Sequence, residues 1–143
     1  MVRKVLLTIK GTQVDSGETE AVEFVTEGRL YKNADGYRLE YDETELSGED
    51  GVTTQLLLED NSVTLSRSGA DGTQMVFTEN QLFESNYSTP HGTMRMSVFA
   101  LHVDSRISDK SGSVNLEYEL NLGDLSTVNR LNLSYKAKKG RIN

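Results

Sequence analysis

The sequence predicts an all-β protein, a single antiparallel up-and-down β-barrel whose consecutive strands are joined by short turns. Apolar residues recur at every second position in run after run, which is the period of a strand with one buried face. Turn-forming residues separate these runs, and no run has a helical period. A long meander avoids exposed edges by closing, so a barrel of about 8–10 strands is favoured and two packed sheets are the alternative.

In the first half of the chain, strands are expected around residues 5–9, 22–32, 37–41, 54–58 and 63–67, where apolar side chains alternate with polar ones. Turns are expected between them at 15–17, 33–36, 48–51 and 60–62, where Gly, Asp, Asn and Ser gather. The second turn ends in Asp35-Gly36, a pair that favours the primed two-residue turns of β-hairpins.

In the second half, strands are expected around 75–77, 82–88, 94–103, 114–122 and 131–135, with turns at 69–72, 79–80, 109–112 and 123–124. Met96, Val98 and Ala100 share one parity, whereas Leu101 and Val103 have the other, which predicts a β-bulge. Residues 104–109 are the one candidate for a helical turn.

A stiff reversal is expected at residues 87–96, which include the only proline and one of the two histidines. Pro90 has a fixed φ and no N–H, and Gly92 can adopt the positive φ of a tight turn. His91 is then a residue of a hairpin corner, and contact with a ligand at the barrel rim is the sharper alternative.

The composition excludes several classes of function. A net charge of −7 and a pI near 4.8 argue against nucleic acid or an anionic membrane as the main partner. The absence of cysteine excludes disulfides, thiolate zinc sites and cysteine nucleophiles. The apolar run at the start is too short for a signal peptide, so a soluble cytoplasmic protein is expected. One domain over 1–143 is expected, with 136–143 as a frayed basic tail.

No catalytic residue, metal site or cofactor is predicted. His91 and His102 are 11 positions apart, roughly 36 Å on a continuous strand, and they differ in parity. The serines lie in no Gly-x-Ser-x-Gly elbow, and no glycine-rich loop precedes a helix.

A candidate ligand-binding cluster follows from extending the apolar parity of the strands. Inward positions then reach Glu43, Glu45, Arg67 and Tyr87. The full candidate set is Glu43, Glu45, Arg67, Tyr87, His91, Met94, Met96 and Tyr118. In one interpretation, Arg67 and Tyr87 hold the polar head of a small amphiphilic ligand whose apolar part lies on Met94, Met96, Tyr118 and Leu133. In the other, Arg67 pairs with Glu43 or Glu45, Tyr87 satisfies a leftover acceptor, and the cluster closes the barrel end.

Several segments in this order resemble the YwiB-like family of uncharacterised bacterial β-barrel proteins. They are residues 41–45 followed by Gly48, then Arg67-Ser68-Gly69, Met75-Val76-Phe77, Tyr87-x-Thr89-Pro90-x-Gly92, and Gly112 leading to Leu116-x-Tyr118-x-Leu120. The resemblance covers nearly the whole chain, and the segment around Pro90 is its most specific part. It departs at Asn80, where the family pattern has glycine. It implies a lipocalin-like (calycin) barrel and no particular activity.

Three functions remain open at this point. The first is a non-enzymatic binding module for a small amphiphilic molecule in the barrel. The second is a protein-interaction or structural barrel whose core is filled by its own side chains. The third and least favoured is an acid–base enzyme using Glu43, Glu45 or His91. A homodimer, if formed, would most simply be two-fold symmetric.

Overall fold

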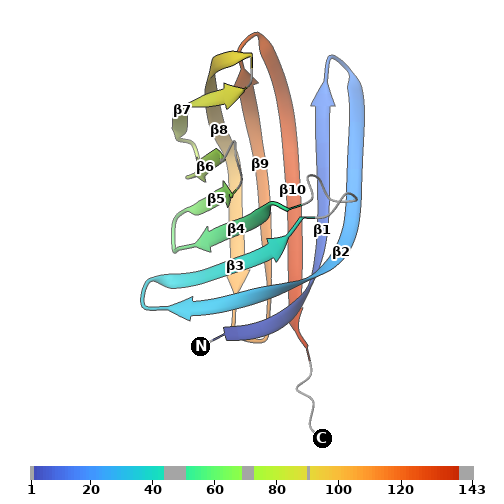
Figure 1. The fold of residues 1–143 in the computed structure, drawn as a ribbon, viewed down its shortest axis with the longest axis vertical. Coiled ribbons are helices and arrows are strands. Elements are labelled where there is room, and N and C mark those ends of the chain that lie inside the picture. Colours follow the sequence, from blue (N-terminus) through green and yellow to red (C-terminus); the bar gives the residue numbers. More distant parts are fainter. Residues whose placement is uncertain (1, 44–50, 69–72, 90, 139–143) are drawn as a thin grey trace, which may run out of the picture.

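The computed structural model describes residues 2–43, 51–68, 73–89 and 91–138, and they form strands joined by turns. The described part contains no helix (Figure 1). The strands are β1 (Val2–Asp15), β2 (Glu18–Asn33), β3 (Gly36–Asp42), β4 (Thr53–Leu58), β5 (Val63–Arg67), β6 (Thr73–Phe77), β7 (Leu82–Thr89), β8 (Gly92–Ile107), β9 (Ser111–Leu122) and β10 (Leu125–Ala137). The all-β prediction is confirmed.

One antiparallel sheet holds all of these strands, in the order β6-β5-β4-β3-β2-β1-β10-β9-β8-β7. Neighbours in the sheet are neighbours in the sequence except where β1 pairs with β10. The sheet curls until β6 approaches β7 and β8, which gives the expected up-and-down barrel in a nearly closed form. The β1–β2, β7–β8 and β9–β10 turns lie at one end, here called the mouth, opposite the chain termini (Figure 1).

The seam between β6 and β7 is held by the corner that joins them. Asn80 donates its backbone N–H to the Ala100 carbonyl at 2.8 Å, and the Glu79 carboxylate accepts the Val103 N–H at 3.0 Å. Asn80 adopts a positive φ of 62°, which asparagine tolerates well, so it takes the role of glycine in this turn. The corner therefore bonds to β8, and no ladder joins β6 to β7 within the described ranges.

The β-bulge predicted in β8 is confirmed. The β8–β9 register shifts between Ala100 and His102, which leaves Leu101 as the extra residue. Val103 thereby returns to the inner face, opposite Leu116. The helical turn expected at 104–109 is wrong, because β8 continues to Ile107 and Ser105 stays in register with Val114.

The hairpin at 33–36 forms, but not with the expected primed turn. Asn33 pairs with Gly36, so the turn residues are Ala34 and Asp35, and neither has a positive φ. Gly36 itself has the unusual φ of 154°, and a Cβ there would collide with the Leu58 carbonyl oxygen. The close approach of the backbone at the end of β4 therefore explains this glycine. The corner at Pro90, the turn at 69–72 and most of the 48–51 turn lie outside the described residues.

The half of the barrel away from the mouth is filled with apolar side chains. Leu7, Leu39, Leu56, Phe77 and Val114 are all at most 1% exposed. Tyr135 closes this layer and donates its hydroxyl to the Ser108 carbonyl at 2.6 Å. Toward the mouth, Gly11, Thr127 and Asn129 interrupt the apolar inward rows of β1 and β10, and a cavity lies in that half.

Candidate functional site

A cavity of about 270 Å³ lies inside the mouth half of the barrel, where β2 leaves β3. The β2–β3 ladder covers only residues 29–33 of β2, although β2 begins at Glu18. The remaining part of β2 pairs with β1 alone, so the sheet opens on that side. The residues lining the cavity are Ile9, Gly11, Thr12, Gln13, Glu20, Val22, Phe24, Tyr41, Arg67, Tyr118, Asn129, Arg130 and Leu131.

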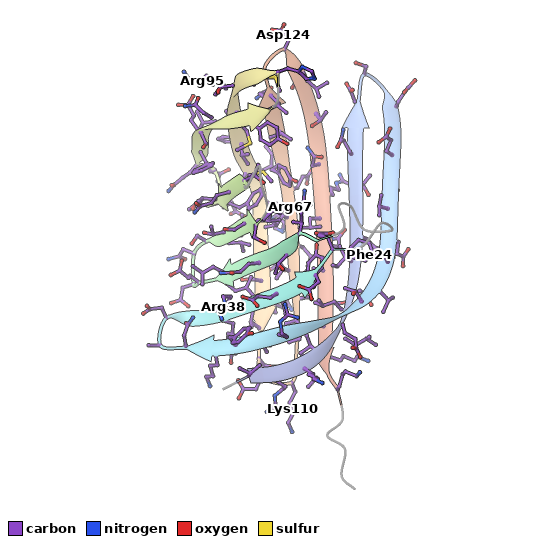
Figure 2. The ribbon with its side chains drawn as sticks, viewed as in Figure 1. Phe24, Arg38, Arg67, Arg95, Lys110 and Asp124 are labelled. Atoms are coloured by element: carbon purple, nitrogen blue, oxygen red, sulfur yellow. The ribbon has the colours of Figure 1, made fainter. Side chains whose placement is uncertain are left out.

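Arg67 reaches this cavity from the last position of β5. Its register partners are Thr54 on β4 and Thr73 on β6, which continue the inward rows of the sheet. In Figure 2 its side chain lies inside the outline of the barrel, at a level similar to that of Phe24 on β2. Its exposed side chain forms no ion pair with any residue that the structure describes. Of the two partners proposed for Arg67, Glu43 forms no ion pair with it, and Glu45 lies outside the described residues.

Glu43 is buried at 4% exposure and belongs to a hydrogen-bonded group beside the cavity. The Thr54 hydroxyl donates to its carboxylate. Burial raises the pKa of Tyr41 to about 12, and the Glu43 charge adds to this rise while the Arg67 charge opposes it. Glu43 is thus held by the protein, and Tyr41 keeps its proton at neutral pH.

Tyr118 presents its ring to the cavity from β9. Burial raises the pKa of its hydroxyl, and the positive charge of Arg67 opposes that rise. The ring packs on Phe77, with centroids 4.7 Å apart, which anchors it to the filled half. Tyr41 packs likewise on Phe24, at 6.2 Å. Two tyrosine hydroxyls and one guanidinium therefore influence one another around the same space.

Gly11 lies in a wall of the cavity and has open space in front of it. It lies on the inner face of β1, after Leu7 and Ile9, and a Cβ placed on it would meet no atom within 4 Å. Gly112, also on an inner face, differs sharply, since a Cβ there would lie 2.5–2.7 Å from the Tyr135 ring. The lack of a side chain at Gly112 therefore makes room for the Tyr135 ring, whereas at Gly11 it leaves open space.

The structure brings only part of the predicted cluster together. Arg67 and Tyr118 line the cavity, and Glu43 lies next to it through Thr54. Tyr87 and Met94 face each other across β7 and β8, nearer the rim. The remaining three are placed as follows: Met96 is buried and borders a separate pocket of about 280 Å³ at the β6–β7 seam, His91 is exposed in the β7–β8 turn, and Glu45 lies outside the described residues.

The predicted apolar wall is built differently from the expectation. Leu133 lies in the filled half at 2% exposure. The apolar side of the cavity comes instead from Ile9, Phe24 and Leu131. Gln13 and Asn129 add amide groups opposite each other on β1 and β10. Strand parity does indicate that Asn129 faces inward, because it continues the inward row of Leu131 and Leu133.

Within the described ranges, no group of three or more His, Asp or Glu side chains is arranged to hold a metal ion. The same residues include no helix of the length and apolarity needed to cross a membrane.

A nearly closed meander barrel, filled at one end and hollow at its mouth, defines the class of this protein as a small antiparallel β-barrel with an interior cavity. The family model called "Domain of unknown function (DUF1934)" matches residues 7–134, and the chain belongs to this family.

Two comparisons place the chain beside YwiB. It is 24% identical over 120 residues to the uncharacterized beta-barrel protein YwiB of Bacillus subtilis (strain 168), covering 84% of this chain and 83% of that protein. It also matches the crystal structure of ywiB protein from Bacillus subtilis with a TM-score of 0.84, at 20% identity, over 96% of this chain and 94% of that one. The predicted membership of a YwiB-like β-barrel family is confirmed, and the structural match concerns the fold.

Proposed function

We propose that this protein is a non-enzymatic binding module that holds a small amphiphilic molecule in the mouth cavity. The observation that carries the proposal is the cavity itself, open at Gly11 in a barrel whose other half is tightly filled. The cavity opens to the outside where β2 leaves β3, which gives a small molecule a path of entry.

The lining suits a ligand with one apolar side and one polar end. Phe24, Ile9 and Leu131 supply an apolar wall, while Arg67 and Tyr118 supply polar groups. Convergence of a few polar groups on an apolar pocket is typical of small-molecule sites. At about 30 Å³ per water molecule in the liquid, the cavity holds about nine waters, so a ligand of about ten non-hydrogen atoms fits.

The candidate acid–base groups support binding more than chemistry. Glu43 is buried and engaged by Thr54, and His91 lies exposed in the turn at the tip of β7 and β8. We therefore assign neither a catalytic role in this proposal.

Native mass spectrometry tests the proposal, with the protein incubated in a small-molecule extract of its host and then compared with the denatured sample. Gly11→Leu places a branched four-carbon side chain into the open space and should abolish any extra mass. Lys10→Leu adds the same side chain on the exposed outer face of the same strand and should retain it. Absence of an adduct on the wild type, or an adduct that survives Gly11→Leu, would contradict the proposal.

A further inference from the structure

Arg67 differs in its surroundings from the five arginines that pair with a carboxylate. Arginines on the outer face have carboxylate partners within 4 Å; these are Arg29, Arg38, Arg95, Arg106 and Arg130. Arg67 faces inward, and its partners in register are threonines. A guanidinium carries five N–H donors, and those of Arg67 bond to no acceptor among the residues that the structure describes.

Neither Glu43 nor Glu20, the carboxylates near the cavity, forms an ion pair with Arg67. Glu43 is engaged by the Thr54 hydroxyl beneath the cavity. Glu20 is exposed near the rim, opposite Gln13. The lining of the cavity also includes two residues with hydrogen-bond donors, Arg67 and Tyr118.

Arg67 and the tyrosines share one environment. The charge of Arg67 acts on both Tyr41 and Tyr118, which reach the cavity from β3 and β9. An acceptor placed among these three side chains would receive bonds from different strands at once. On the far side, Phe24 offers an aromatic face that already packs on Tyr41.

We infer that the ligand of the mouth cavity is a small monocarboxylate, with its carboxylate bound by Arg67 and Tyr118 and its hydrocarbon part packed on Phe24 and Leu131. This inference rests on the proposed function and specifies its ligand class. One guanidinium matches one carboxylate by two parallel hydrogen bonds. A phosphate ester carries more charge than one arginine neutralises, and the nearby Glu43 disfavours that excess.

The test uses two probes of the same shape, phenylacetate and phenylacetamide, titrated against isotope-labelled protein and followed by amide chemical shifts. Each has ten non-hydrogen atoms, which matches the size of the cavity. The wild type should bind phenylacetate roughly tenfold more tightly, the ratio expected for hydrogen bonds to a charged group. The shifts should centre on Gly11 and Tyr118.

Arg67→Gln should bring the two affinities to about the same value, because the charge and the two parallel donors of the guanidinium are lost. Arg95→Gln is the matched control. It changes the net charge equally, but Arg95 pairs with Glu84 on the outer face, so the preference should persist. If Arg67→Gln does not fold, Arg67→Lys replaces it and should reduce the preference at least roughly threefold, since an ammonium cannot form the two parallel bonds.

The outcomes separate this inference from the proposed function. Equal binding of the two probes by the wild type, or a preference that survives the Arg67 variants, overturns the carboxylate assignment and leaves the cavity as a binding site. Failure of both probes, with an adduct from host extract that Gly11→Leu abolishes, also overturns the ligand class alone. Failure of both probes, with no such adduct, overturns the ligand class and the proposed function together.

Discussion

Replacing Gly11 and Gly112 by alanine in separate variants tests whether the barrel is open around Gly11 and tightly packed around Gly112. Both glycines lie on inner faces, and neither has a positive φ, so the added methyl group is the same perturbation in both cases. At Gly11 the methyl meets no atom within 4 Å. The variant should gain about 0.5–1 kcal/mol, because alanine loses less conformational freedom on folding than glycine does.

At Gly112 the methyl would lie 2.5 Å from Cε2 and 2.7 Å from Cζ and Oη of Tyr135. The ring must move by about 1 Å to reach ordinary contact, which typically costs about 1–3 kcal/mol in a packed core. Movement of the ring also strains the hydrogen bond from the Tyr135 hydroxyl to the Ser108 carbonyl, which is worth about 0.5–1.5 kcal/mol. After the gain from replacing glycine, a net loss of about 1–3 kcal/mol remains.

Urea unfolding of the two variants and the wild type, followed by circular dichroism, measures both values. We expect the midpoints to move in opposite directions, with a difference of about 2–4 kcal/mol between the variants. A loss of more than about 1 kcal/mol in Gly11→Ala would refute the reasoning, since it would mean that the mouth half is packed around Gly11. An unchanged Gly112→Ala would refute the packing of Tyr135.

Two further predictions concern the buried tyrosines and the bulge. Burial raises the pKa of Tyr41 and of Tyr135 to about 12, whereas tyrosine in an unfolded chain titrates near 10. Between about pH 10 and 12 the unfolded state therefore binds fewer protons, and stability should fall with rising pH by about 2–3 kcal/mol for each. Phenolate absorbance should show Tyr41 and Tyr135 among the tyrosines that ionise late, and a single transition near pH 10 would contradict this. Deleting Leu101 should preserve the fold, because the remaining residues form a regular ladder, whereas deleting Asn115 from β9 should abolish it by reversing parity. Amide spectra distinguish the two results, and equal damage by both deletions would contradict the role of the bulge.

The strands were predictable because one face of each is buried, so alternation survives along most of their length. The clearest case is β9, where Val114, Leu116 and Tyr118 mark the inner face. The helical turn at 104–109 was expected because the bulge interrupts parity at Leu101 and the residues after it are mostly polar. Continuation of β8 is decided by its ladder with β9, which local composition does not reveal.

The candidate site was only partly predictable, for a geometric reason. Parity identified Arg67 and Tyr118 as inward residues. It does not say which inward residues of distant strands lie at the same level, because that depends on strand tilt and stagger around the barrel. Because of this stagger, Phe24 and Asn129 line the cavity, whereas Met96 borders the pocket between β6 and β7.

The pairing of β1 with β10 has a consequence for how the chain reaches its fold. Every other ladder joins consecutive strands, whereas this ladder joins the first strand of the sequence to the last, with Val5 opposite Ala137. A circularly permuted chain that links these ends and opens between Phe77 and Leu82 would begin at β7 and finish at β6. Its strands would then follow each other in the sheet in the same order as in the sequence, and all ladders would become local. Such a permutant keeps the same sheet with a much lower contact order and should fold faster than the parent.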